Sequence, residues 1–220
     1  MRFISHLDLY RLFKRCIKRA EIPVGWSNGF NPHEKVNLVQ PLSLGFESLG
    51  EYFEIELTKD MEPDALLAGM NSFMPEGIRF TGITEIPASV KNMSAISDYA
   101  LYAAEYAGDA SGFAESFPAF LAQESITITK KDKKTKKPVE RDIKSYIRSA
   151  MLLRADGQGA EFALGLRCAT NQTLNPSNLL ESYFKYCSVS AEPGDLRICR
   201  RDLYFEKEGV LLPLSDIQQR

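Results

Sequence analysis

The sequence predicts an α+β protein with two successive units, each with the order strand, helix, strand, strand, helix, strand and an antiparallel sheet. The 220 residues are enough for two domains of about 100 residues each. Apolar residues make up 44% of the chain, as in an ordinary globular protein with a packed core. The same order of helical and alternating patterns occurs in residues 1–86 and again in residues 98–220, with a linker at residues 87–97. This order is that of two tandem ferredoxin-like (βαββαβ) units.

The first unit contains the clearest amphipathic helix of the chain. Ser5 is expected to cap its start, and Pro23 ends it. Its apolar positions recur at helical spacing and are Leu9, Leu12, Phe13, Cys16, Ile17 and Ala20. The other predicted elements are strands at residues 1–4, 35–40, 51–57 and 78–86 and a helix that begins near Pro63.

The second unit follows the same order, with an extra strand or long hairpin near its middle. Its predicted helices cover residues 112–123, with a kink at Pro118, and residues 175–186. Its predicted strands cover residues 99–106, 125–130, 139–153, 161–169 and 196–205.

Charge and cysteine content narrow the classes of function. The formal net charge is −2, so contact with nucleic acid would come from local basic patches. The cysteines are Cys16, Cys168, Cys187 and Cys199. No two of them have C-x-x-C spacing and none clusters with a histidine, which argues against a zinc or iron–sulfur site. The sequence has no signal peptide, no apolar run of about 20 residues and no phosphate-binding glycine loop. We therefore expect a cytoplasmic protein with reduced thiols, no cofactor and no membrane contact.

Residues 2–57 carry four spaced motifs, which are Ser5–Asp8 (Ser-His-Leu-Asp), Gly29–Pro32 (Gly-Phe-Asn-Pro), Pro41–Gly45 (Pro-Leu-x-x-Gly) and Glu51–Tyr52 (Glu-Tyr). In this order they resemble the radical-SAM-linked family, a bacterial domain of unknown function found beside or fused to radical-SAM proteins. Residues 141–143 and 200–202 fit that family more loosely. The resemblance implies a radical-SAM protein as partner. The chain itself has no C-x-x-x-C-x-x-C motif, so it is not a radical-SAM enzyme.

The first helix and the loop after it form a candidate surface for RNA. Five cations fall within nine positions of the helix and are Arg11, Lys14, Arg15, Lys18 and Arg19. Trp26, Phe30 and Asn31 lie in the glycine-rich loop that follows. Guanidinium groups beside exposed aromatic rings suit the phosphates and bases of single-stranded RNA. The alternative is that the cations form a solvated helix face and that the two aromatic side chains fill the core.

Two other segments are candidates for anion or RNA contact. Ser5 and His6 stand at the positive end of the first helix, where a neutral imidazole can act as an acid or base or help to hold an anion. The alternative is that Ser5 only caps the helix and His6 packs locally. The run at residues 130–137 has six lysines in eight positions, and its candidate RNA contacts are Lys130, Lys131, Lys133 and Lys134. The alternative is a hairpin tip that these lysines keep soluble.

Three hypotheses follow for the function. The first is a non-catalytic module that binds RNA or another substrate for a radical-SAM enzyme. The second is a metal-independent endoribonuclease like those that process CRISPR repeats, with His6 or His33 as the acid–base residue. The third is a protein-docking subunit that touches no nucleic acid. We expect no independent catalytic activity and no metal site.

Overall fold

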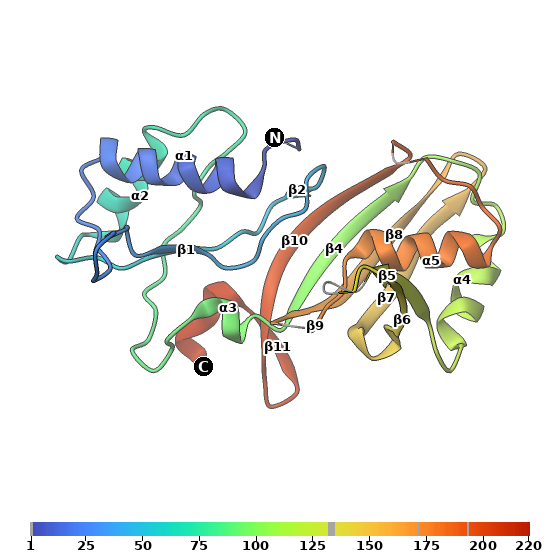
Figure 1. Cartoon of the computed structure of the whole chain (residues 1–220). Coiled ribbons are helices and arrows are strands. Elements are labelled where there is room, and N and C mark those ends of the chain that lie inside the picture. The colour runs from blue at the N-terminus through green and yellow to red at the C-terminus, as the bar shows by residue number, and fades with distance from the viewer. Residues whose placement is uncertain (1, 132–134, 171, 193) are drawn as a thin grey trace.

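The structure is a computed structural model that describes residues 2–131, 135–170, 172–192 and 194–220. Figure 1 shows a part with α1 and α2 at one end and a long twisted sheet with α4 and α5 at the other. The helices are α1 (His6–Arg19), α2 (Pro63–Asn71), α3 (Met93–Ile96), α4 (Phe113–Ala122) and α5 (Pro176–Tyr186), with short 3-10 helices η1 (Lys144–Tyr146) and η2 (Leu214–Gln219). None of the helices in these described ranges is long and apolar enough to cross a membrane.

Within the described residues, the strands form one large sheet and two small ones. They are β1 (Val36–Leu38), β2 (Glu47–Ser48), β3 (Phe53–Ile55), β4 (Tyr99–Tyr106), β5 (Thr127–Lys131), β6 (Pro138–Asp142), β7 (Ile147–Asp156), β8 (Gly159–Ala169), β9 (Gln172–Thr173), β10 (Leu196–Lys207) and β11 (Val210–Pro213). In the large sheet the order is β11-β10-β4-β8-β7, and all of these neighbours are antiparallel. β2 joins β10 in parallel, so the large sheet is mixed.

The main core lies between the large sheet and helices α4 and α5. Alternate residues of β4 and β8 are buried on the helix-covered side and are Ala100, Tyr102, Ala104, Tyr106, Ala160, Phe162, Leu164, Leu166 and Cys168. Tyr183 of α5 is fully buried, with its ring centroid 5.0 Å from that of Phe113 and 4.9 Å from that of Phe117. This alternation is what an antiparallel sheet with one covered face requires.

The second half has the element order β4-α4-β7-β8-α5-β10, with the β5–β6 hairpin inserted after α4. This is the strand and helix order predicted for that half. The predicted kink residue, Pro118, lies inside α4. The predicted strand at residues 139–153 is divided by η1 into β6 and β7, because the chain turns at Ile143, which is buried.

The first half differs from the prediction, so the tandem ferredoxin-like arrangement is not confirmed. Its own sheet, within the described residues, pairs only β1 with β3, and α1 and α2 pack on it around a small core. The strand predicted at residues 78–86 is wrong, because the backbone of Phe80 pairs with the side chain of Asn71 instead of with a strand, at 2.9 Å for both hydrogen bonds. The strand predicted at residues 1–4 is also absent from the described residues 2–4.

A buried ion pair joins the two halves. Arg200 of β10 is 4% exposed and faces the helix-covered side of the sheet, opposite Tyr102. Its Nη1 donates to both carboxylate oxygens of Glu51 at 2.9 Å. Its Nη2 donates to the carbonyl oxygen of Pro41 at 2.9 Å. The segment from Pro41 to Glu51 therefore wraps around one guanidinium group of the other half.

Replacing Arg200 with methionine tests how much stability depends on this pair. Methionine keeps a long side chain but leaves the Glu51 carboxylate largely buried without a cation. Removing one partner of a buried ion pair costs about 3–5 kcal/mol, so we expect the free energy of unfolding in urea to fall by about that amount.

The control for this experiment is Arg154→Gln, which breaks exposed contacts of Arg154 with Asp156 and Glu161. Exposed ion pairs contribute little to stability because water screens them, so this variant should unfold almost like the wild type. Equal unfolding free energies for R200M and R154Q would contradict a structural role for the buried pair.

Candidate functional site

The motifs at residues 41–45, 51–52 and 200–202 meet at the junction between the halves. Besides the Arg200–Glu51 pair, the hydroxyl of Tyr52 donates to Oδ1 of Asp202 at 2.7 Å. The hydroxyl of Ser48 donates to Oε1 of Glu51 at 2.6 Å. Both motif segments stand out in the sequence, but the pairing of their side chains could not be predicted from it, because the partners lie about 150 positions apart and share no local pattern.

Burial at the junction changes the pKa values of Glu51 and Tyr52. Burial raises the pKa of the Glu51 carboxyl above its usual value, because desolvation outweighs the positive charge of Arg200. Burial also raises the pKa of the Tyr52 phenol, and Asp202 adds to this rise by accepting the phenol's hydrogen bond. Tyr52 therefore remains a protonated donor to Asp202.

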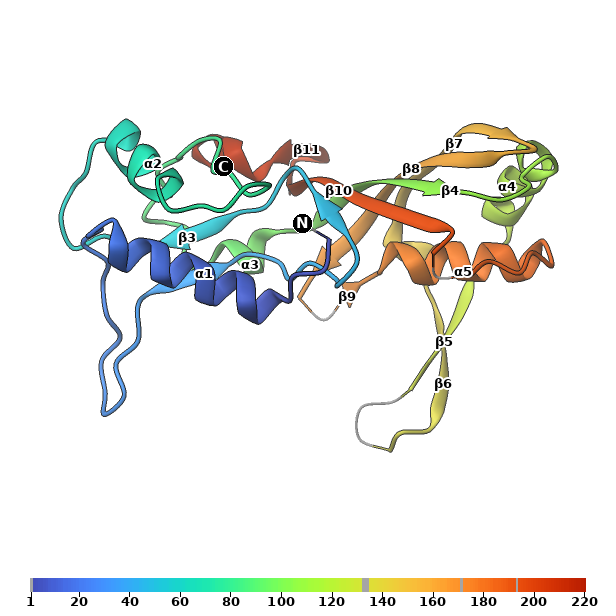
Figure 2. The same cartoon turned by 90° about the horizontal axis from the view of Figure 1, so that it is seen from above.

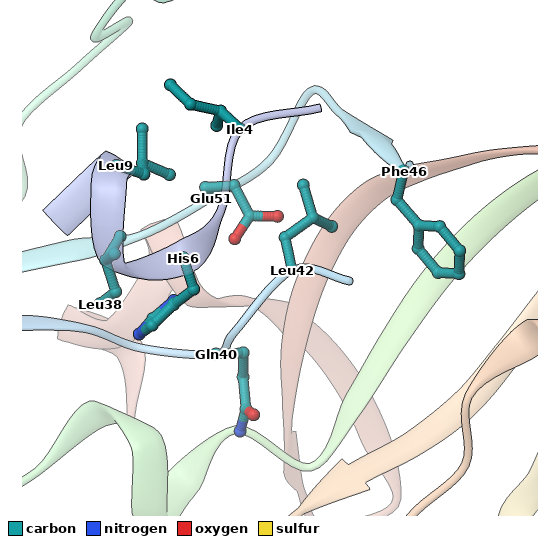
Figure 3. Close-up of a pocket in the computed structure, with 8 residues that line it drawn as sticks. All are labelled: Ile4, His6, Leu9, Leu38, Gln40, Leu42, Phe46 and Glu51. Carbon is teal, nitrogen blue, oxygen red and sulfur yellow. The ribbon is translucent and has the colours of Figure 1, made fainter. Parts of the chain in front are cut away.

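A small cavity opens beside this junction (Figure 3). Its polar side chains are His6 from the start of α1, Gln40 from the segment after β1, and Glu51. Its apolar lining is Ile4, Leu9, Leu38, Leu42 and Phe46. Its volume of about 20 Å³ accommodates one water molecule, whereas small-molecule sites usually span about 300 Å³ or more. The structure thus brings His6 and Glu51, two acid–base groups, to one water-sized space.

The other groups near the start of α1 have local partners. The hydroxyl oxygen of Ser5 accepts from the backbone N–H of Asp8 at 3.1 Å and donates to Oδ2 of that residue at 2.7 Å, which confirms the predicted N-cap. The hydrogen bond from Ser5 and the nearby Arg11 hold the pKa of Asp8 below its usual value. His33 does not line the cavity and lies in an exposed loop, where its Nδ1 is 2.8 Å from the hydroxyl of Ser27.

The five cations of α1 have different environments. Lys14 is half-buried and pairs with Glu34 at 2.5 Å, and the guanidinium of Arg19 lies 4.5 Å from the ring centroid of Phe73. Arg11 pairs with Asp8 at 3.2 Å. Arg15 and Lys18 are exposed, and neither forms an ion pair within the part of the chain that the structure describes. The charge of this helix that has no ion pair among the described residues therefore lies at Arg15, Lys18 and Arg19, and of these Arg15 and Lys18 also have no ring contact.

The loop after α1 is a hairpin whose aromatic side chains face solvent. Trp26 is 54% exposed and pairs through its backbone with Glu34, and Phe30 is fully exposed. The Lys14–Glu34 contact attaches the base of this hairpin to α1. The interpretation of Trp26 and Phe30 as core residues is therefore wrong. The neighbouring Asn31 is also exposed.

The predicted lysine hairpin is formed by β5 and β6. Figure 2 shows that it projects to the same side of the molecule as the hairpin at residues 24–36. Burial lowers the pKa of Lys130, and the charge of Arg141 lowers it further. Lys133, Lys134 and the side chain of Lys131 lie outside the described residues.

Comparisons with known proteins place the chain in a family. No curated protein matches its sequence. A chain in a crystal structure of a Cbf5-Nop10-Gar1 complex is similar in fold, with a TM-score of 0.52 and 10% sequence identity over 92% of this chain. The match covers 46% of that chain, so this protein spans about half its length, and at this identity the likeness shows the fold alone. The model of a family described as an uncharacterized protein conserved in bacteria, DUF2344, matches residues 1–176, and the chain therefore belongs to that family.

Proposed function

We propose that this protein is a non-catalytic module that binds RNA, or an RNA-linked substrate, for a radical-SAM enzyme. The observation that supports this most directly is the exposure of Trp26 and Phe30 on a hairpin attached to α1. The identity of the partner enzyme rests on the resemblance of residues 2–57 to the radical-SAM-linked family, and RNA is the ligand that the surface chemistry favours.

Two large rings in water are unfavourable for an isolated chain, since burying such side chains contributes about 1.5–3 kcal/mol each. Single-stranded RNA offers bases that stack on such rings and phosphates that neutralise nearby cations. Arg15 and Lys18 supply those cations one turn apart on α1, close enough for adjacent phosphates of one strand. Aromatic rings and cations on adjoining elements favour RNA over a purely apolar partner.

The lysine hairpin supports the same ligand. It projects to the same side of the molecule as the aromatic hairpin (Figure 2). A strand of RNA bound on that side would meet a basic or aromatic element at either end. The protein's net charge of −2 makes this local placement of cations the basis of binding, because the whole surface does not attract a polyanion.

The contribution of the α1 cations to RNA affinity is tested with the double variant Arg15→Gln and Lys18→Gln. Each phosphate neutralised on a single strand contributes about −0.7 to the slope of log affinity against log salt, so two lost contacts should flatten the slope by about 1.4 units. The measurement is fluorescence anisotropy with a labelled single-stranded RNA at several salt concentrations.

The matched control is Arg154→Gln with Arg197→Gln, because both of these cations already pair with carboxylates. It removes the same formal charge and should leave the slope unchanged. Equal slopes for the R15Q/K18Q variant and the wild type would show that α1 is only a solvated face.

The stacking contribution is tested with Trp26→Ala and Phe30→Ala. Each lost base–ring stack should weaken binding by about 1–3 kcal/mol, with no change in salt slope, because no charge is removed. Leu153→Ala is the matched control, since this side chain is as exposed as Trp26 but lies on β7. Unchanged affinity in both aromatic variants would favour the protein-docking hypothesis.

The endoribonuclease is the second candidate, because His6 and Glu51 share a water-sized cavity. We expect the purified protein to leave bound RNA intact on denaturing gels, with and without divalent cations. Cleavage that His6→Ala abolishes and His33→Ala preserves would replace the binding proposal with this one, because His33 lies in the exposed loop and does not line the cavity.

A further inference from the structure

The face of the large sheet opposite α4 and α5 carries a row of aromatic and basic side chains. The strand register places Tyr99 of β4 between Tyr204 of β10 and Arg167 of β8. Directly paired residues point to the same face, and this face is the one opposite the buried core residues of β4 and β8. Figure 2 shows β7 and β8 with no helix on the side opposite α5.

A β-bulge adds a second arginine to this row. In β7, Ile147 pairs with Leu166 and Ser149 with Gly165, so Arg148 between them has no partner residue on β8. A bulge of this kind redirects a side chain out of the regular alternation. The guanidinium carbon of Arg148 lies 6.0 Å from the ring centroid of Tyr99.

Arg167 reaches the same ring from the neighbouring strand. Its guanidinium carbon lies 5.4 Å from the ring centroid of Tyr99, and its Nη1 donates to the Tyr99 hydroxyl at 3.1 Å. The structure thus brings two guanidinium groups to one buried tyrosine side chain on the sheet face opposite α4 and α5.

The charges of these arginines are not compensated. Arg148 donates to the carbonyl oxygen of Gly209 at 3.2 Å, and Arg167 donates to the amide oxygen of Gln172 at 2.9 Å, so neutral acceptors hold both groups. Neither arginine forms an ion pair in the described ranges. The carboxylate of the adjacent Asp98 accepts instead from the backbone N–H of Glu206 at 3.0 Å.

We propose that Arg148 and Arg167 bind a phosphate group of the RNA backbone on this sheet face, as a second contact apart from α1. This inference rests on the proposed function, because it takes RNA as the source of the phosphate. Both guanidinium groups lie within 6.0 Å of the Tyr99 ring centroid, and an oxyanion that contacts both would reduce the repulsion between their like charges through charge-assisted hydrogen bonds. Guanidinium groups match a phosphate because they donate in pairs from one plane.

A structural explanation competes with this inference. The two arginines lie against the ring of Tyr99, which is 8% exposed, and these contacts alone can stabilise the fold. The structural explanation predicts that losing both arginines lowers the melting temperature and leaves RNA binding unchanged. The phosphate site predicts a change in the salt dependence of binding.

The test compares Arg148→Gln with Arg167→Gln against Arg148→Lys with Arg167→Lys in the full chain. For a labelled single-stranded RNA, the glutamine variant should show a salt slope flatter by about 0.7 units, because one phosphate contact is lost, whereas the lysine variant should keep the wild-type slope because it keeps both charges. The control is again Arg154→Gln with Arg197→Gln, whose cations lie on β7 and β10 and already pair with carboxylates.

A second measurement distinguishes RNA from a small phosphate as the ligand. It also distinguishes the sheet site from the α1 surface. Titration with inorganic pyrophosphate should shift the Arg148 and Arg167 side-chain NMR signals, and it does not depend on RNA. A wild-type slope in the glutamine variant overturns the sheet site alone and leaves the α1 surface standing. A wild type that binds pyrophosphate but no RNA overturns both RNA proposals and identifies a site for small phosphates. No binding of either probe overturns the inference entirely.

Discussion

The ion pair between Arg200 and Glu51 is the constraint on which the junction of this molecule depends. A guanidinium inside a sheet-and-helix core needs a partner of opposite charge and acceptors for its N–H groups, because transfer of a charge from water is costly. Both Nη atoms of Arg200 have acceptors, whereas its buried Nε has none among the described residues. Glu51 supplies the charge, and the carbonyl of Pro41 accepts from the second nitrogen. The segment that joins β1 to β3 is therefore held by the last long strand of the chain, and β2 adds two residues in parallel to that strand.

This attachment also explains where the polar side chains of the N-terminal motifs lie. With Pro41 and Glu51 held at β10, the start of α1 closes over them, and His6, Gln40 and Glu51 line one water-sized cavity. The opposite end of the same unit is free of that constraint. There the hairpin at residues 24–36 is attached to α1 through Lys14 and Glu34, and its rings face solvent.

Arginine has three physical roles in this chain. Arg200 is buried and paired, so it contributes to structure. Arg154 is exposed and paired, so it adds little stability and little net charge. Arg148 and Arg167 are held by neutral acceptors, and Arg15 is exposed on α1, so their charge remains to interact with an anion. The distinction depends on the partner of each guanidinium, because all five carry the same charge at neutral pH.

The sequence by itself determined the local elements. The Ser5 cap, the apolar spacing of α1, the start of α2 at Pro63 and the element order of the second half follow from hydrogen bonds and side-chain periodicities within a few residues. Tertiary structure decided the pairing of Arg200 with Glu51 and the bulge at Arg148. It also decided that the backbone of Phe80 bonds to the Asn71 side chain instead of to a strand, and that Trp26 and Phe30 face solvent. These features arise from contacts outside the helix and strand periodicities, most of them between segments far apart in the sequence, and no local pattern of residues records their geometry.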